Sequence, residues 1–89
     1  MRLLVTPTFQ RTVKKLHADE KAALDDAVRL IISDPTAGDA KVGDLSGVRV
    51  FKFRLKKQLC LLAYTQQDDE TLKLLAIGSH ENFYRDLKR

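Results

Sequence analysis

Two long apolar runs near the C-terminal end constrain the fold of this chain more than any other feature. Residues 59–65 and 71–77 are almost continuously apolar, and only a short acidic segment at residues 66–70 separates them. Runs of this length, bounded by turn residues, are typical of central β-strands whose two faces are both covered. We therefore expect an antiparallel pair of strands at the centre of a sheet, with a turn at residues 66–70.

A third strand is predicted directly before this pair. Side chains alternate in character over residues 48–55, as they do in a strand with two different faces. Phe51 and Phe53 share one face, whereas Lys52 and Arg54 share the other. Arg49 lies on the face opposite Lys52, and a tight connection then leads into the run that begins at residue 59.

The N-terminal half has the pattern of a strand followed by a helical hairpin. Residues 1–5 are compatible with a strand, and Thr6 followed by proline offers an N-cap for a first helix. Asp19 is a suitable N-cap for a second helix with a broad apolar stripe, which the Asp34-Pro35 pair should end. A connecting loop is expected at residues 36–47.

The predicted architecture is a single α+β domain over residues 1–89. It comprises an N-terminal strand, a helical hairpin, a three-stranded antiparallel meander and a short C-terminal helix capped by Ser79. Two helices can cover only one face of such a sheet, yet the central runs are apolar on both. We expect either the C-terminal segment or a bound partner to cover the other face.

Charge and composition narrow the possible functions. The net charge of +4 and pI near 9.4 favour a polyanionic partner such as nucleic acid, although the same charge serves ordinary solubility. The lone cysteine, Cys60, excludes an internal disulfide and fits a reducing cytoplasm. We expect no signal peptide and no membrane span. The sequence lacks glycine-rich phosphate loops and metal-binding motifs, so we expect no metal and no cofactor.

A cationic track is predicted along the third strand. Lys52, Arg54 and Lys56 alternate on one face, so their side chains project about 7 Å apart, close to the spacing of phosphates in an extended RNA strand. The alternative interpretation is a solvated sheet face. Placement of these side chains in the fold decides between the two.

The segment after the last strand carries the candidate acid-base chemistry. His80 follows Gly78-Ser79 at a strand end, where a histidine can exchange a proton near neutral pH, as RNA cleavage by its own 2′-hydroxyl requires. It could instead make a local hydrogen bond at a helix start. Tyr84 is one helical turn beyond His80 and can stack on an unpaired base or pack on the sheet, and Arg85 adjoins it.

This order of elements resembles the RelE/ParE superfamily of toxins from type II toxin-antitoxin systems, in its ParE-like and YafQ-like branches. The resemblance spans the chain. Its most specific parts are the Gly43-Asp44-Leu45-Ser46-Gly47 segment, the strand tyrosine Tyr64, and the ending in which Gly78-Ser79-His80 precedes Tyr84. At two places the chain departs from the pattern: residues 56–59 lack the YafQ-like histidines and aspartate-tryptophan pair, and Leu61 stands where RelE has arginine.

The resemblance implies a metal-independent, ribosome-dependent endoribonuclease that cuts messenger RNA and blocks translation. It implies that His80 and Tyr84 are catalytic, while Lys52, Arg54, Lys56 and Arg85 bind RNA phosphates. An inhibitor of DNA gyrase without catalysis is the first alternative, and an inactive antitoxin-binding module is the second. In each case a cognate antitoxin is the expected partner, in a toxin-antitoxin hetero-oligomer, with a helix or strand on the uncovered apolar sheet face.

Overall fold

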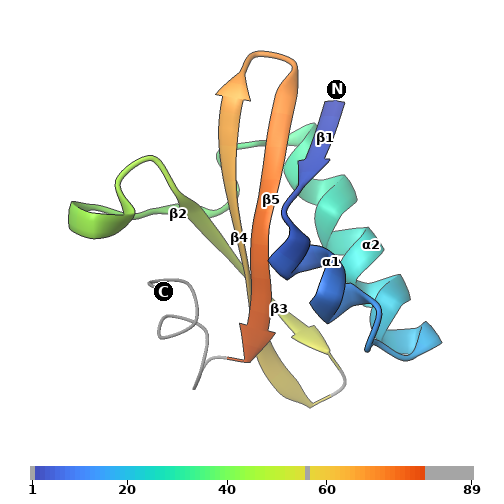
Figure 1. Cartoon of the computed structure of the whole chain (residues 1–89). Coiled ribbons are helices and arrows are strands. Elements are labelled where there is room, and N and C mark those ends of the chain that lie inside the picture. Colours follow the sequence, from blue (N-terminus) through green and yellow to red (C-terminus); the bar gives the residue numbers. More distant parts are fainter. Residues whose placement is uncertain (1, 56, 80–89) are drawn as a thin grey trace.

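A five-stranded mixed sheet carries both helices on one of its faces (Figure 1). The computed structural model describes residues 2–55 and 57–79. The elements are β1 Arg2–Val5, α1 Pro7–Val13, α2 Ala18–Ser33, β2 Asp39–Ala40, a 3-10 turn Gly43–Leu45, β3 Arg49–Leu55, β4 Gln58–Asp68 and β5 Thr71–Ser79. The strand order is β1-β5-β4-β3-β2, so β1 and β2 are the edge strands.

The antiparallel meander of β3, β4 and β5 confirms the prediction from the apolar runs. The β4–β5 turn is shorter than expected, because β4 continues to Asp68 and only Asp69 and Glu70 form the turn. The N-terminal strand is also confirmed, and it pairs in parallel with β5. The sequence did not predict β2. This two-residue strand lies inside the expected loop and pairs with Arg49 and Val50 of β3.

Both helices form where the sequence places them, with one shift at the start of α2. The Thr6 hydroxyl accepts a hydrogen bond from the Phe9 amide, as expected of an N-cap before a proline. Helix α2 begins at Ala18, so Asp19 is not its N-cap. His17 occupies that position instead, and its amide donates to the Glu20 carboxylate at 3.0 Å. The helix ends before Asp34 and Pro35, as predicted.

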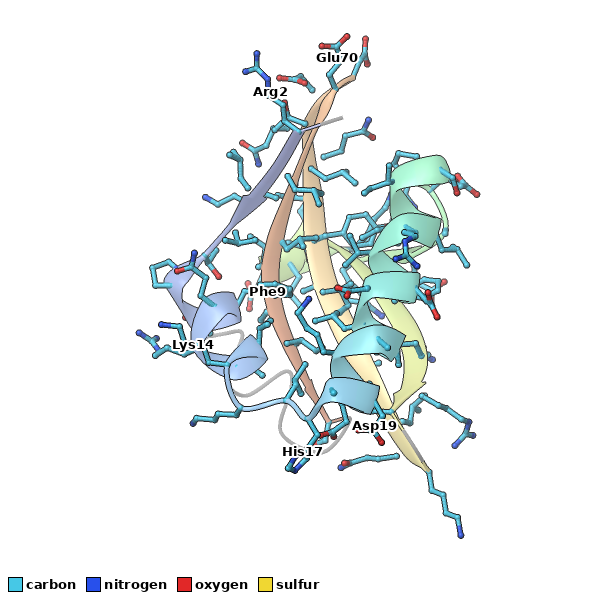
Figure 2. The ribbon with its side chains drawn as sticks, turned by 90° about the vertical axis from the view of Figure 1, so that its right-hand side faces the viewer. Arg2, Phe9, Lys14, His17, Asp19 and Glu70 are labelled. Carbon is cyan, nitrogen blue, oxygen red and sulfur yellow. The ribbon has the colours of Figure 1, made fainter. Side chains whose placement is uncertain are left out.

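The main core lies between the helices and the sheet. Side chains from both layers meet there with almost no solvent exposure, among them Phe9, Leu24, Ile31, Leu62, Tyr64 and Leu72. Phe9 extends from α1 toward the sheet, as Figure 2 shows. No helix among the described residues is long and apolar enough to cross a membrane.

A β-bulge interrupts the pairing of β4 with β5. Ala63 pairs with Ala76 and Tyr64 with Leu74, so Leu75 has no partner across from it.

The second face carries its own small cluster of buried residues, Val50, Leu61, Ala63 and Ala76. The prediction that this face is apolar and covered is confirmed in that these side chains are buried, whereas a bound antitoxin on this face stays a prediction. The predicted C-terminal helix lies outside the described residues.

Candidate nucleic-acid interface

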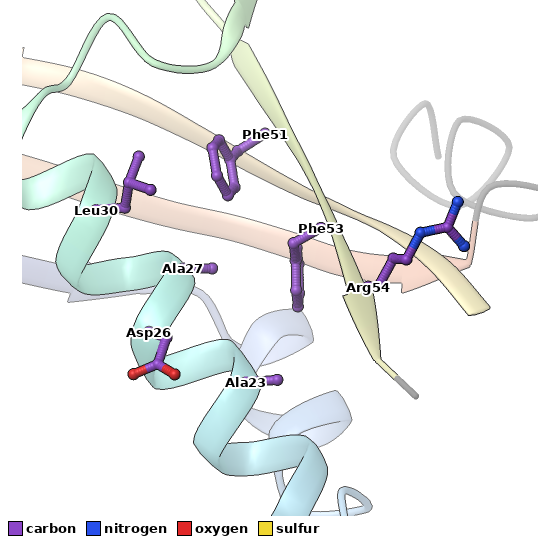
Figure 3. Close-up of a pocket in the computed structure, with 7 residues that line it drawn as sticks. All are labelled: Ala23, Asp26, Ala27, Leu30, Phe51, Phe53 and Arg54. Atoms are coloured by element: carbon purple, nitrogen blue, oxygen red, sulfur yellow. The ribbon is translucent and has the colours of Figure 1, made fainter. Parts of the chain in front are cut away.

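Lys52 and Arg54 project from the second face of the sheet, away from the helices. Both are exposed, whereas Phe51 and Phe53 on the same strand are partly buried against the main core. Figure 3 shows Phe51 and Phe53 directed toward α2 and Arg54 directed away from it. Neither cation forms an ion pair with another described side chain. The sequence-based placement of these two cations on one face is therefore confirmed.

A rigid strand fixes the spacing of this cationic pair. Lys52 pairs with Leu61 and Arg54 with Leu59 on β4, so the backbone beneath both cations is held in the sheet. Leu61 has no exposed surface, and it anchors the strand beside Lys52. Two charges about 7 Å apart can hold adjacent phosphates. Because the strand backbone is already ordered, binding does not cost additional backbone conformational entropy.

The other predicted site residues lie outside the described part of the chain. Lys56, His80, Tyr84 and Arg85 belong to this group. The sheet register locates Ser79, the last described residue. Ser79 pairs with Cys60 on β4, and Cys60 pairs with Phe53 on β3, beside Arg54. Since neighbouring strands are about 4.8 Å apart, β5 ends about 10 Å from the β3 backbone that carries the cations.

Arg49 lies on the opposite face, where it has a structural role. Its guanidinium donates to the Gly38 carbonyl at 2.8 Å, on the helix side of the sheet. Nearby, the Tyr64 hydroxyl donates to the Pro35 carbonyl at 2.7 Å and accepts from the Gly38 amide at 2.9 Å. A Cβ at Gly38 would meet that hydroxyl at 2.8 Å, so the position requires glycine. These bonds fasten the segment after α2 to the sheet and keep Arg49 out of the cationic pair.

The environments of Cys60, Tyr64 and His17 indicate structural positions and not catalytic ones. Cys60 is buried, and burial raises the pKa of its thiol, which disfavours the reactive thiolate. Burial likewise raises the pKa of Tyr64. His17 is exposed at the start of α2, at the end of the molecule opposite Arg2 and Glu70 (Figure 2). Within residues 2–55 and 57–79, no cluster of His, Cys, Asp or Glu side chains could hold a metal ion.

Sequence reasoning missed a groove between α2 and β3 (Figure 3). It measures about 320 Å³ and is mostly apolar. Its lining consists of Ala23, Asp26, Ala27 and Leu30 on the helix and Phe51, Phe53 and Arg54 on the strand. The two phenyl rings stack with centroids 6.4 Å apart. The signal was the pair of alanines four residues apart on α2, but only the strand register shows that they face aromatic side chains.

Comparison with solved structures agrees with this geometry. The chain is similar to RelE in the E. coli RelBE toxin-antitoxin complex, with a TM-score of 0.69 and 14% identity over 88% of this chain and 94% of that one. Isolated E. coli RelE gives a TM-score of 0.67 and 15% identity over 99% and 96% of the two chains. A RelE-RelB complex from Pyrococcus horikoshii gives 0.55 and 13% over 88% and 92%. At these identities the likeness establishes the fold.

Comparison with family models establishes the family. A comparison with curated proteins finds no match. A model of the ParE-like toxin of type II bacterial toxin-antitoxin systems matches residues 3–88, almost the whole chain. Together with the RelE-like sheet and helical hairpin, this match shows that the chain belongs to the ParE-like toxins of type II bacterial toxin-antitoxin systems, within the RelE/ParE superfamily.

Proposed function

We propose that this toxin is an endoribonuclease that cuts messenger RNA on the ribosome and thereby blocks translation. The observation that carries the proposal is the pair of exposed cations Lys52 and Arg54, on a rigid strand facing away from the helices. Neither forms an ion pair within residues 2–55 and 57–79. A nuclease needs such charges to hold the scissile phosphate and to stabilise the additional charge that develops on it. The fold shared with E. coli RelE supports this choice.

In this proposal, His80 and Tyr84 supply the acid-base chemistry, and Lys56 and Arg85 extend the phosphate-binding surface. The support is positional, because β5 ends at Ser79, about 10 Å from the β3 backbone beneath Lys52 and Arg54. An imidazole reaching from there can exchange a proton with a ribose held on the cationic pair. The reaction needs no metal ion.

The cellular setting follows from the family. We infer that a cognate antitoxin binds this chain in a hetero-oligomer in the cytoplasm, since the E. coli RelBE structure is a toxin-antitoxin complex. Release of the antitoxin would then expose the cationic face to the ribosome.

Gyrase inhibition is the second candidate, and one observation favours it. The only histidine among the described residues, His17, lies on the helix side of the sheet, so the described part of the face with Lys52 and Arg54 offers no histidine for proton transfer. A ParE-like inhibitor that binds gyrase without catalysis needs none, and the matching family model is ParE-like.

Induction of the toxin in cells, followed by primer extension on cellular RNA and by plasmid topology, separates the two functions. The nuclease proposal predicts new RNA ends that disappear in a His80→Ala, Tyr84→Phe double variant, with a loss of about 10²- to 10⁴-fold for the missing proton transfer. Plasmid supercoiling should stay normal. Relaxed plasmid without new RNA ends would establish the gyrase alternative, and normal growth would indicate an inactive module.

A further inference from the structure

The outer edge of β1 is open and apolar. Strand β1 pairs with β5 on one side, and no other described strand pairs with its second side. Leu3, Leu4 and Val5 are 41%, 48% and 39% exposed, although all three are large apolar residues. An exposed apolar edge attracts another strand, which satisfies the free backbone groups and buries the side chains. This edge is therefore suited to pairing with a further strand.

The backbone geometry of β1 determines which of its groups face outward. The amides of Arg2 and Thr6 donate to carbonyls at Glu70 and on β5, at 2.6 Å and 3.2 Å, so these two residues direct their backbone groups toward β5. Successive residues of a strand point their N–H and C=O groups in opposite directions. Those of Leu3 and Val5 therefore face the open side.

A hollow on the helix side of this edge has room for an apolar side chain. Leu3 and Val5 lie on the helix side, because they pair with Leu72 and Leu74 of the main core. The hollow measures about 320 Å³ and lies where the end of β1 meets α1. Its mostly apolar lining consists of Val5, Phe9, Gln10, Val13 and Lys14.

The two ends of the β1 edge carry opposite charge. At the start of the strand, the three acidic side chains of residues 68–70 adjoin Arg2. At the other end, residues 7–15 include the cations Arg11, Lys14 and Lys15 and no acidic residue. Figure 2 shows Arg2 and Lys14 toward these two ends. A partner strand that brings the reverse order of charges matches this edge best.

A second copy of this chain brings that reverse order when its β1 runs antiparallel to the first. A two-fold axis perpendicular to the sheet then places the acidic end of each copy beside the basic end of the other. Hydrogen-bonded pairs in an antiparallel ladder join residues whose backbone groups both face the partner strand. The register that uses both outward-facing residues sets Leu3 of each copy opposite Val5 of the other, beside the hollow. It sets Leu4 opposite Leu4.

We propose that this chain forms a homodimer in which the β1 strands of two copies pair antiparallel, with Leu4 on the two-fold axis. The two five-stranded sheets become one continuous sheet. Since β5 and β4 separate β1 from β3, Lys52 and Arg54 remain exposed in each copy. The dimer removes the apolar edge from water and leaves the proposed RNA-binding face free.

Cysteine cross-linking tests this register in the purified full-length protein, with oxidised glutathione as the oxidant. Leu4→Cys places two thiols in a pair whose Cα atoms are about 4.5 Å apart, within the range of a disulfide. Leu3→Cys is the matched control, because its two copies are diagonal neighbours roughly 7 to 8 Å apart, beyond that range. Cys60 is buried and does not compete. We expect the covalent dimer of Leu4→Cys to form at least about ten-fold faster than that of Leu3→Cys.

Sedimentation velocity measures the association without a cross-link. The weight-average sedimentation coefficient should rise from the monomer value toward the dimer value between about 1 and 500 µM protein, the weak affinity of a small interface. Leu4→Lys sets two like charges opposite one another on the axis and should weaken dimerisation at least about ten-fold. Leu30→Lys is the matched control, because Leu30 is 46% exposed on α2, and it should leave the association unchanged.

The contribution of the charged ends is tested separately. Asp69→Lys reverses one charge at the acidic end and should weaken dimerisation several-fold, because this end faces the cations of the second copy. Asp44→Lys makes the same change at an exposed position in the turn after β2 and should have no effect.

Three results would overturn the proposal: a monomer at every concentration up to ~0.5 mM, cross-linking of Leu3→Cys as fast as that of Leu4→Cys, or equal association of Leu4→Lys and the unaltered chain. Species larger than a dimer that grow with concentration would also overturn it, because a two-fold interface is closed. None of these readouts involves RNA or gyrase. The dimer and the nuclease proposal can therefore each fail without the other.

Discussion

The two faces of the sheet differ in the size of their buried clusters and in the charge of their exposed side chains. The helix side buries large residues such as Leu62, Tyr64 and Leu72, each with no exposed surface. The second face buries a smaller cluster, made up of Val50, Leu61, Ala63 and Ala76, and it carries Lys52 and Arg54 on β3. Free energy of burial scales with apolar area, so stability is concentrated on the helix side and the second face is available for function.

The largest expected effect tests the helix side. Leu62→Ala removes a fully buried side chain from the main core and should lower the free energy of unfolding by about 2 to 5 kcal/mol. Urea denaturation measures the change. Val42→Ala is the control, because Val42 is 88% exposed and its truncation should have little effect. Equal losses in both variants would contradict the assignment of the core.

A smaller loss is expected when one buried hydroxyl is removed from the same side. Tyr64→Phe keeps the ring in place but leaves the Gly38 amide without its acceptor and the Pro35 carbonyl without its donor. The cost should be about 1 to 3 kcal/mol, the usual range for unsatisfied buried groups. The variant should also loosen the segment after α2, which amide hydrogen exchange at Gly38 would detect. Unchanged protection there would show that the hydroxyl is dispensable.

Alkaline pH should weaken the helix side through two buried groups. Burial raises the pKa of both Cys60 and Tyr64, so the folded state favours their neutral forms. This contribution is complete below the ordinary thiol pKa of 9.0 and is lost as pH rises toward the raised folded values. Unfolding measured between pH 8 and 11 should show falling stability, and Cys60→Ala should remove part of the slope. A flat profile would contradict burial of these groups.

The smallest effect on stability is expected on the second face. Lys52→Gln and Arg54→Gln change exposed side chains without ion pairs to other described residues, so each should alter the free energy of unfolding by no more than about 0.5 kcal/mol. Thermal unfolding is sufficient to check this. A loss comparable to that of Leu62→Ala would show that these cations support the fold rather than a ligand.

The sequence predicted the elements that depend on local patterns. Apolar runs located β4 and β5, alternation placed Lys52 and Arg54 on one face, and Thr6 marked the start of α1. It did not predict β2, whose two residues form a strand only because Arg49 and Val50 are already in place. The bulge at Leu75 was also missed, since it arises from the register between two strands.

In the candidate site too, features set by local sequence patterns could be predicted and features set by contacts between distant residues could not. Its cationic half could be predicted because alternation is a local property, whereas the adjoining groove depends on which face of α2 meets Phe51 and Phe53. The role of Tyr64 was equally hidden, because its partners Pro35 and Gly38 are distant in sequence. The roles of Lys56, His80, Tyr84 and Arg85 remain predictions from sequence.

The rate of messenger RNA cleavage in a purified translation system tests the central claim most directly. A Lys52→Gln, Arg54→Gln double variant is compared with a Lys14→Gln, Lys15→Gln variant, which loses the same charge from exposed positions at the C-terminal end of α1. With both variants fully folded, we expect cleavage to fall at least about 10²-fold in the first, as when charge-stabilising groups are removed from other active sites, and to persist in the second. Equal cleavage by the two variants would contradict the assignment of the second face to RNA.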